Sequence, residues 1–164
     1  FTYQGDGDLA AIGIAETLHA INRGENILIV FVNNAVYGMT SGQMAPTTLP
    51  GMHTTTSPDG RDVSYYGAPI KVSELMSNLP GSFYVTRQAV NNPNAVRRTK
   101  KALLNAFKYQ QLHKGTCLVE IIGNCPSNWK MTPVEASKFI DEEMIKTFPL
   151  GDIKIPNAED LKIF

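Results

Sequence analysis

The amino-acid sequence predicts a three-layer α/β/α fold with a mostly parallel central sheet. Segments of strand character alternate with segments of helical period, and this alternation is typical of parallel strands that lie between helices. Residues 27–32 are continuously apolar and rich in β-branched side chains, as expected for a parallel strand that is covered on both faces. With 164 residues, of which 43% are hydrophobic, the chain is long enough to bury the core of one domain.

The composition argues against several classes of partner. Fifteen Lys and Arg residues balance fifteen Asp and Glu residues, so neither nucleic acid nor an anionic membrane is an expected partner. The longest apolar run, residues 27–32, is much shorter than the ~20 residues that a membrane-spanning helix needs. Two cysteines are too few for a disulfide scaffold. We therefore expect a soluble, cytoplasmic protein.

The first predicted unit is a βαβ crossover. Residues 1–4 resemble the end of a strand and no methionine or leader precedes them, so we expect a fragment that lacks its N-terminal part. Apolar residues then recur at helical spacing over residues 8–23, and Gly24 provides a stop. The apolar strand at 27–32 completes the unit.

The predicted elements that follow are less regular at first. Residues 38–64 show no clear period, so we expect a long loop that is partly mobile until a cofactor and a partner order it. A short strand at 70–72, a short helix at 74–79 capped by Ser73, and a strand at 82–90 should follow.

The last third of the chain has clearer boundaries. Asn92 and Pro93 predict the start of a helix that ends before Gly115, followed by an apolar strand at 116–122. A capping box that begins at Thr132 predicts a helix to about residue 146. We expect the domain to span residues 1–149 and residues 150–164 to form a tail without a clear pattern. The face of the helix after Asn92 is predicted to be marked by Val96, Leu103 and Phe107.

Two polar motifs follow strands that should be neighbours. Ligands of open α/β sheets bind at the carboxyl ends of the strands, and Gly-Asp-Gly-Asp at 5–8 and Asn-Asn at 33–34 each follow such a strand. The glycines let the backbone approach a ligand, while Asp6 and Asn34 offer the oxygen atoms that Mg²⁺ prefers. Together they suit Mg²⁺ with a diphosphate, although each motif alone is also common turn or strand-end chemistry.

The spacing of the two motifs is more specific than either motif. Gly-Asp-Gly, twenty-five further residues and then Asn-Asn resemble the thiamine diphosphate-binding motif. Residues 33–48 resemble the corresponding segment of the β subunits of 2-oxoacid:ferredoxin oxidoreductases, and the likeness continues into Cys-Pro-Ser-Asn-Trp at 125–129. The resemblance covers residues 1–146 and implies the thiamine diphosphate-binding fold.

This resemblance implies a set of site residues. Asp6 and Asn34 would bind Mg²⁺ through their side chains and Val36 through its carbonyl oxygen. Other residues would surround the diphosphate, and none is expected to be catalytic. The expected cofactor-binding set is Gly5, Asp6, Gly7, Asp8, Asn34, Val36, Tyr37 and Thr40.

The resemblance also implies an iron–sulfur cluster in the full-length protein. Cys125 corresponds to the last of four cysteines that hold a four-iron four-sulfur cluster in the family, and the other three belong to an N-terminal segment that this chain does not contain. Cys125 is therefore a candidate cluster ligand whose partners lie outside the sequence.

The implied function is that of an enzyme subunit. A 2-oxoacid would be decarboxylated oxidatively to an acyl-CoA, and ferredoxin would accept the electrons. An α subunit would carry the pyrimidine-binding domain, so we expect this chain alone to bind thiamine diphosphate poorly and to be inactive. Ser41 replaces a lysine of some relatives, which leaves 2-ketoisovalerate and 2-oxoglutarate both open as substrates. A non-oxidative thiamine diphosphate-dependent decarboxylase or carboligase subunit and a non-catalytic assembly module are the alternatives.

Several other residues have weaker claims to a role. His19 and His113 are interpreted as structural or solvent-facing, whereas His53 is a candidate site residue. The four basic residues within 97–101 indicate a solvated helix face, with docking of an acidic ferredoxin as the less favoured alternative. Three methionines of the long loop either line an apolar substrate pocket or fill an adaptable loop: Met39, Met44 and Met52.

Overall fold

A five-stranded sheet forms the centre of the structure, a computed structural model that describes residues 1–161. The strand order is β1-β2-β6-β5-β7, in which β1, β2, β6 and β5 are parallel and β7 is antiparallel to β5. The predicted α/β fold with a mostly parallel sheet is confirmed. The strands are β1 (Thr2–Gln4), β2 (Leu28–Asn33), β5 (Ser82–Ala89), β6 (Thr116–Ile122) and β7 (Gly151–Lys154).

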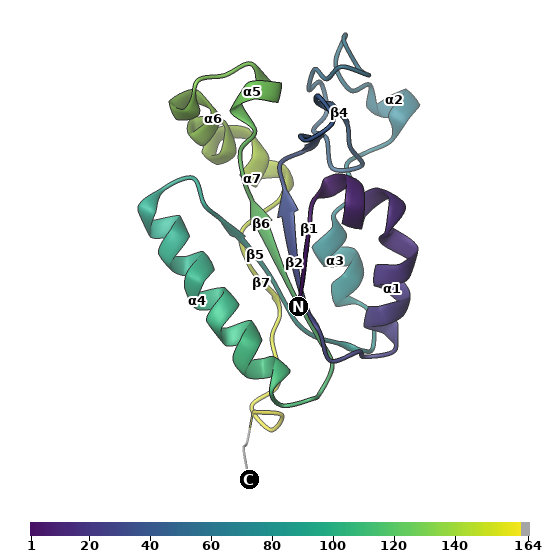
Figure 1. Ribbon diagram of the computed structural model, residues 1–164, viewed down its shortest axis with the longest axis vertical. Helices are drawn as coiled ribbons and strands as arrows, with labels where there is room; N and C mark the ends of the chain where they lie inside the picture. The colour runs from purple at the N-terminus through teal and green to yellow at the C-terminus, as the bar shows by residue number, and fades with distance from the viewer. Residues whose placement is uncertain (162–164) are drawn as a thin grey trace.

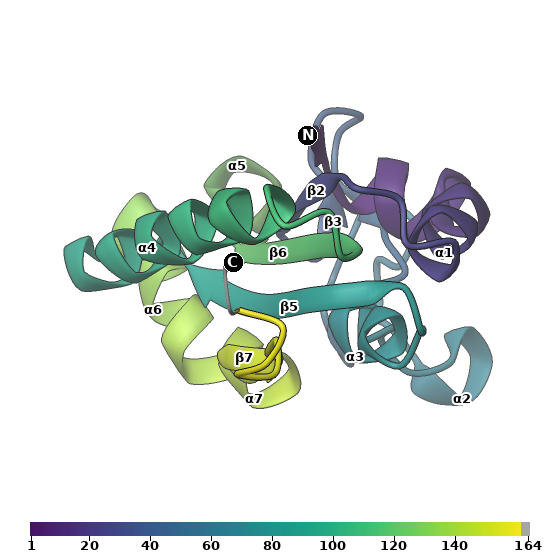
Figure 2. The ribbon, with the colours of Figure 1, turned by 90° about the horizontal axis from the view of Figure 1, so that it is seen from below.

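Helices cover both faces of this sheet, as Figures 1 and 2 show. One face carries a π-helical turn (Asp8–Ile12), α1 (Ile14–Asn22) and α3 (Val72–Ser77), and the opposite face carries α4 (Pro93–Gln110). Along β2, Ile29 and Phe31 pack toward α1 and α3, while Leu28 and Val30 pack toward α4. A strand buried on both faces needs this continuous apolar sequence.

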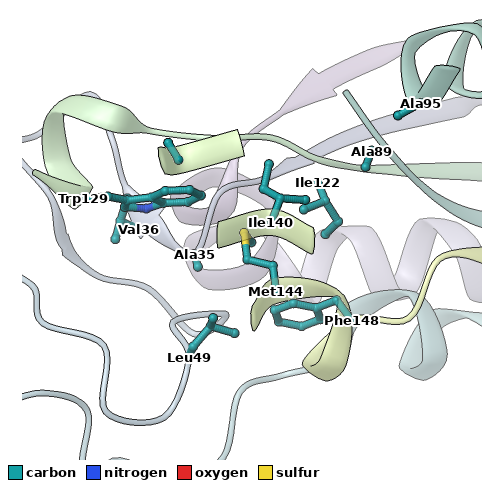
Figure 3. Packing of buried hydrophobic residues seen from close by; sticks show 11 residues of the cluster. Ala35, Val36, Leu49, Ala89, Ala95, Ile122, Trp129, Ile140, Met144 and Phe148 are labelled. Carbon is teal, nitrogen blue, oxygen red and sulfur yellow. The ribbon is translucent and has the colours of Figure 1, made fainter. Parts of the chain in front are cut away.

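A third group of elements lies beyond the carboxyl ends of β2 and β6 (Figure 1). Its helical part packs around a core that contains Trp129, Met144 and Phe148, and Figure 3 shows Trp129 beside Val36 in this core. The remaining part is the long loop after β2. The elements of this group are β3 (Val36–Tyr37), β4 (Gln43–Met44), α2 (Val63–Tyr66), α5 (Pro126–Trp129), α6 (Pro133–Phe139), a π-helical turn (Ile140–Met144) and α7 (Ile145–Thr147).

Local sequence signals account for the start of two helices. The Asn92 side chain accepts a hydrogen bond from the Ala95 N–H at 2.9 Å, so the predicted cap of α4 is confirmed. Thr132 and Glu135 form the predicted capping box at the start of α6. In both helices proline occupies the first turn, where its missing N–H costs nothing.

Three predictions of local structure are wrong. Residues 70–72 do not form a strand; Ile70 is 38% exposed, and α3 begins at Val72 rather than near residue 74. The tail contains the strand β7, which pairs with β5. Its four residues are too few to show a strand pattern in the sequence. The segment 8–23 is not one α-helix, because it begins with a π-helical turn.

The predicted buried face of α4 is also largely wrong. Val96 and Phe107 are 47% and 41% exposed, and only Leu103 packs against the core. Small side chains let α4 approach β5 and β6 closely, so the larger apolar residues lie to the side of the contact. The buried residues of α4 are Ala95, Thr99, Ala102 and Ala106.

The long loop has more internal contacts than its sequence suggests. Arg61 is buried and donates hydrogen bonds to main-chain carbonyl oxygens within residues 45–48 and 66–68. The Ile70 N–H also donates to the Pro46 carbonyl oxygen at 2.9 Å. These contacts tie separate parts of the loop to one another, whereas its predicted mobility stays a prediction.

No helix within residues 1–161 is long and apolar enough to cross a membrane.

Candidate functional site

The two polar motifs meet at the carboxyl ends of β1 and β2. These strands are paired so that Gln4 lies opposite Phe31, which brings the residues after each strand side by side. The Asn34 N–H donates a hydrogen bond to Asp6 Oδ2 at 2.9 Å. The predicted proximity of Asp6 and Asn34 is therefore observed, and it follows directly from the parallel pairing of the two strands.

Three polar groups converge at this point. The end of the Asn34 side-chain amide lies 3.0 Å from Asp6 Oδ2 and 2.7 Å from the Val36 carbonyl oxygen. With its nitrogen turned inward, the amide donates hydrogen bonds to both oxygens. With its oxygen turned inward, it completes a cluster of three oxygens that needs a cation to offset their mutual repulsion. The arrangement thus accommodates either an amide hydrogen-bond pair or a cation.

Asp6 is buried at only 3% exposure, which is unusual for a carboxylate. Its Oδ1 accepts a hydrogen bond from the Thr47 hydroxyl, and its Oδ2 accepts from Asn34. Burial raises the pKa of Asp6 to about 7 despite these two hydrogen bonds, and the charge of Glu120 acts in the same direction. Such a carboxyl group is ready to exchange its proton for a cation near neutral pH.

The turn that carries Asn34 is held from two sides. Ala35 has a left-handed φ of 61°, a conformation that is rare for a residue with a side chain. The Ala35 N–H donates to Asn33 Oδ1 at 3.1 Å, and the Ala35 carbonyl accepts from the Thr48 hydroxyl at 2.5 Å. Asn33 in turn donates to the buried Glu120 at 2.7 Å. These contacts fix the backbone between Asn34 and Val36.

A pocket of about 390 Å³ opens above the cluster of polar groups. Gly7 lines it, and a Cβ atom at Gly7 would lie 3.2 Å from the Tyr37 ring, so a side chain there would require the ring to shift by a few tenths of an ångström. All eight predicted cofactor-binding residues line this one pocket, together with Gly38 and Met39. Its lining is Gly5, Asp6, Gly7, Asp8, Asn34, Val36, Tyr37, Gly38, Met39 and Thr40.

Cys125 lies next to Gly38, one of the residues that line this pocket, but does not line the pocket itself. A Cβ atom built on Gly38 would be 3.3 Å from Cys125 Sγ, so the two residues are in contact distance of each other. Asn128 donates to both the Gly38 carbonyl at 2.9 Å and Cys125 Sγ at 3.0 Å. Within the described residues no group of three or more His, Cys, Asp and Glu side chains gathers around Cys125 or elsewhere. The cluster role of Cys125 stays a prediction.

The residues with weaker claims are separated in the structure. His19 and His113 are exposed, and His53 lines a different hollow with Trp129 and Lys130. The basic residues within 97–101 are exposed on α4, as predicted for a solvated face. Only one of the three loop methionines lines the pocket. Met39 lines it, Met44 borders another hollow, and Met52 packs on the core.

Comparison with known proteins identifies the family. The protein-family model described as "Thiamine pyrophosphate enzyme, C-terminal TPP binding domain" matches residues 1–121. The chain belongs to this family. The two motifs that meet at the carboxyl ends of β1 and β2 lie within the matched segment of this thiamine pyrophosphate-binding domain.

Relatives of this TPP-binding domain are subunits of 2-oxoacid oxidoreductases. The chain is 46% identical over 157 residues to ketoisovalerate oxidoreductase subunit VorA of Methanothermobacter thermautotrophicus, covering 96% of this chain and 33% of that protein. It is 35% identical to 2-oxoglutarate synthase subunit KorB of Archaeoglobus fulgidus, covering 85% and 48%. The predicted resemblance to these subunits is confirmed. The chain spans between a third and a half of the length of these curated relatives.

A solved structure has the same fold. The 2-oxoglutarate:ferredoxin oxidoreductase from Magnetococcus marinus with 2-oxoglutarate, coenzyme A and succinyl-CoA bound matches with a TM-score of 0.69 at 23% identity. The match covers 94% of this chain and 55% of that chain. The thiamine diphosphate-binding fold that the resemblance implied is therefore confirmed.

Several residues around the candidate site were not identified from the sequence. Thr47 and Thr48 belong to the segment 33–48 that carries the resemblance, but nothing in the sequence assigns them a contact. Trp129 donates from Nε1 to the Asn34 carbonyl oxygen at 3.1 Å. A signal exists for Arg61, which is the only Lys or Arg between Arg23 and Lys71.

Proposed function

We propose that this chain is the diphosphate-binding part of a thiamine diphosphate-dependent 2-oxoacid:ferredoxin oxidoreductase. The enzyme would convert a 2-oxoacid to an acyl-CoA and pass electrons to ferredoxin. The observation that carries the proposal is the convergence of Asp6, Asn34 and Val36 beneath a pocket of about 390 Å³. The relatives named as ketoisovalerate and 2-oxoglutarate enzymes support the reaction class.

The polar groups fit Mg²⁺. An octahedral Mg²⁺ site has metal–oxygen distances of about 2.0 to 2.1 Å, which places adjacent ligand oxygens about 2.9 Å apart. The separations of 3.0 Å and 2.7 Å around the Asn34 amide are close to this value. Asp6 Oδ2, Asn34 Oδ1 and the Val36 carbonyl would hold the ion, and diphosphate oxygens and water would complete its ligands. One carboxylate with two neutral oxygens suits an ion that is shared with a negatively charged ligand.

The remaining pocket residues would bind and orient the cofactor. Gly5, Gly7 and Asp8 lie where the backbone approaches the diphosphate, and Thr40 offers a hydroxyl group at the rim. The Tyr37 ring lies against Gly7 and lines the same pocket. Thiamine diphosphate, when bound, supplies the carbanion and the electron sink for decarboxylation. The task of this chain is therefore to hold the charged end of the cofactor.

We further propose two partners, because this chain would hold only the diphosphate end of the cofactor. An α subunit would hold the aminopyrimidine end of the cofactor, and ferredoxin would take the electrons. Cys125, which lies beside Gly38, would ligate an iron–sulfur cluster completed by cysteines outside this sequence. The domain bounds of 1–149 and a cytoplasmic location stay predictions.

The test of the proposed function is cofactor binding by the assembled enzyme. Equilibrium dialysis should show that Asp6→Ala and Asn34→Leu each lower the Mg²⁺-dependent affinity for thiamine diphosphate by at least 100-fold. Asp141→Ala, which removes an exposed carboxylate that does not line the pocket, is the matched control and should bind like the wild type. Unchanged binding by Asp6→Ala would refute the metal assignment. Absence of binding by the wild-type complex would favour the assembly module.

The iron–sulfur part of the proposal has its own test. Cys125→Ser in the full-length complex should lower the iron content while thiamine diphosphate occupancy stays near the wild-type value, because serine replaces thiolate poorly as an iron ligand. An iron content equal to that of the wild type would make Cys125 a structural thiol. A wild-type complex without iron that still consumes 2-oxoacid would instead support the non-oxidative decarboxylase or carboligase.

A further inference from the structure

The turn at residues 45–48 joins the two halves of the candidate site. The Thr47 hydroxyl donates to Asp6 Oδ1, which belongs to the motif after β1. The Thr48 hydroxyl donates to the Ala35 carbonyl at 2.5 Å, which belongs to the motif after β2. Both threonines are fully buried. Two adjacent hydroxyl groups thus contact the two segments that must be aligned for a cation to bind.

The contact of Thr47 has a directional consequence for Asp6. A carboxylate has two oxygens, and the hydrogen bond from Thr47 occupies Oδ1 on the side away from Asn34. Oδ2 is then left facing the Asn34 amide at 3.0 Å. Without the Thr47 hydroxyl, the carboxylate could rotate about χ2, which is a soft torsion for aspartate. Oδ2 also accepts a hydrogen bond from the Asn34 N–H at 2.9 Å, so Thr47 and Asn34 together fix the plane in which the carboxylate presents Oδ2 to the other polar groups.

Arg61 in turn holds the 45–48 turn. Its Nη1 donates to the carbonyl oxygens on both sides of Thr47, those of Pro46 at 3.1 Å and Thr48 at 2.9 Å, and also to that of Ala45 at 3.1 Å. The remaining guanidinium nitrogens bind the second segment of the loop. Nε donates to Gly67, and Nη2 donates to Tyr66 and Ala68, through carbonyl oxygens at 3.0, 3.3 and 3.2 Å.

These six hydrogen bonds explain how a buried cation is tolerated. Arg61 is 5% exposed, and among residues 1–161 it forms no ion pair with a carboxylate. Carbonyl dipoles from two loop segments replace the water that the guanidinium has lost. Only the planar, five-donor fork of arginine can reach both segments at once, because a lysine has three donors on one nitrogen atom.

We propose that Thr47 and Arg61 are positioning residues of the metal site, with Arg61 fixing the 45–48 turn and Thr47 fixing the orientation of the Asp6 carboxylate. The inference rests on the proposed function, because it assumes that Asp6 binds Mg²⁺. It leads to a specific expectation about cation selectivity. Mg²⁺ demands near-ideal octahedral geometry, whereas Ca²⁺ accepts irregular geometry and longer bonds. Loss of the fixed carboxylate should therefore weaken Mg²⁺ binding more than Ca²⁺ binding.

The experiment uses the assembled enzyme and compares Thr47→Val with Thr47→Ser. Thiamine diphosphate binding is titrated with Mg²⁺ and separately with Ca²⁺, and the ratio of the two half-saturating concentrations is the readout. Thr47→Val should raise the half-saturating Mg²⁺ concentration at least 10-fold and the Ca²⁺ concentration less than 3-fold. Thr47→Ser retains the hydroxyl group and should restore the wild-type ratio.

A matched control separates positioning from a general loss of stability. Like Thr47→Val, Thr116→Val removes a buried threonine hydroxyl. The Thr116 hydroxyl donates to the main-chain carbonyl oxygen of Glu25 at 2.6 Å, at the opposite end of the sheet. Thr116→Val should leave the ratio of Mg²⁺ to Ca²⁺ unchanged. If Thr47→Val fails to assemble, Thr47→Cys replaces it, because the thiol is similar in size to the hydroxyl but a weaker hydrogen-bond donor. The cation ratio of Thr47→Cys should lie between the wild-type ratio, which Thr47→Ser retains, and the ratio expected for Thr47→Val.

The role of Arg61 is tested by Arg61→Lys alone and combined with Thr47→Val. Arg61→Lys should shift the cation ratio in the same direction as Thr47→Val. The ratio of the double variant should differ from that of Thr47→Val by less than 2-fold, because both changes release the same carboxylate. Full additivity would overturn the link between the two residues. If Thr47→Val has the same cation ratio as the wild type, the inference is overturned. The proposed function still stands in that case, provided that the wild type binds the cofactor in a Mg²⁺-dependent manner. If the wild type itself binds no cofactor, both fail together.

Discussion

Trp129 Nε1 donates a hydrogen bond of 3.1 Å to the main-chain carbonyl oxygen of Asn34. This bond links α5, which follows β6, to the Asn-Asn motif that follows β2. Trp129 is also the only tryptophan of the sequence, and its ring packs against Phe139 in the core beside the site. The indole is therefore an internal probe of the backbone that carries Asn34.

The fluorescence of Trp129 should report cofactor binding. Mg²⁺ and thiamine diphosphate together should shift or quench its emission, because a cation bound at Asn34 changes the field at the indole N–H. Trp129→Phe should lose this signal and bind the cofactor about 5-fold more weakly, as expected for loss of one hydrogen bond worth about 1 kcal/mol. The difference between the titrations of the two proteins is the measurement. An identical signal in Trp129→Phe would show that it arises elsewhere.

The stability of the metal-free protein should depend on pH through Asp6. Burial raises the pKa of Asp6 to about 7, so the stabilisation from its protonated form is complete below pH 4 and is lost as the pH rises to 7. The loss is on the order of 4 kcal/mol for a shift of about three pKa units. Asp6→Asn cannot titrate at this position. Urea unfolding at pH 5 and pH 8 should show a smaller pH effect for Asp6→Asn than for the wild type.

Cation binding should show the opposite pH trend. Because Mg²⁺ competes with a proton for Asp6, its affinity in the presence of thiamine diphosphate should decrease about 10-fold for each pH unit below the raised pKa. Above pH 8 the affinity should be constant. Calorimetric titrations between pH 5.5 and 8.5 measure this, with release of a proton on binding at pH 6 as the second readout. A constant affinity over this range would mean that the carboxyl group is already ionised.

The buried Arg87 should contribute more to stability than an exposed arginine. Arg87 pairs with Glu120 at 2.8 Å and with Glu74 at 2.5 Å, and its side chain is completely buried. Arg87→Met would leave the Glu120 carboxylate buried without its cation, at a cost of about 3 to 5 kcal/mol in the free energy of unfolding. Arg23→Met, which removes an exposed pair, should cost about 1 kcal/mol or less. Denaturant titrations of both variants provide the comparison.

Amide exchange should separate two parts of the long loop. The Thr48 N–H donates to the Ala45 carbonyl at 3.1 Å inside the turn held by Arg61, and it should exchange slowly in the wild type. Residues 39–41, which lie at the open rim and include the almost fully exposed Met39, should exchange fast. Arg61→Lys should accelerate exchange at Thr48 and leave residues 39–41 unchanged. Equal exchange rates in both parts would contradict a role for Arg61 in the turn.

The sequence predicted the sheet well because its strands carry their own signal. Residues 27–32 are apolar throughout and residues 116–122 are apolar apart from Thr116 and Glu120, and such segments have few alternatives to a buried parallel strand. The positions of Asp6 and Asn34 follow from the same reasoning, since parallel neighbours end at one edge. The assignment of the pocket residues to thiamine diphosphate came from family resemblance and not from the physical pattern.

The elements that escaped prediction depend on contacts between distant residues. β7 has four residues and acquires its strand conformation only by pairing with β5. The buried face of α4 is made of alanines and a threonine, which carry little weight in an apolar periodicity. Arg61 was not recognised because its partners are main-chain carbonyl oxygens, which leave no mark in the sequence. The contact of the Thr48 hydroxyl with the Ala35 carbonyl escaped for the same reason, and that of Thr47 with Asp6 escaped because the two residues are far apart in the sequence.

The position of β1 at the edge of the sheet has a consequence for local unfolding. Within the described residues, β1 pairs only with β2, and Asp6 lies two residues after its end. Local opening of this strand separates Asp6 from Asn34. A cation bound between them therefore opposes detachment of the strand. At 100 times its dissociation constant, the ligand would raise the free energy of opening by about 2.7 kcal/mol, so that occupancy of the pocket would protect the first residues of the chain from proteases.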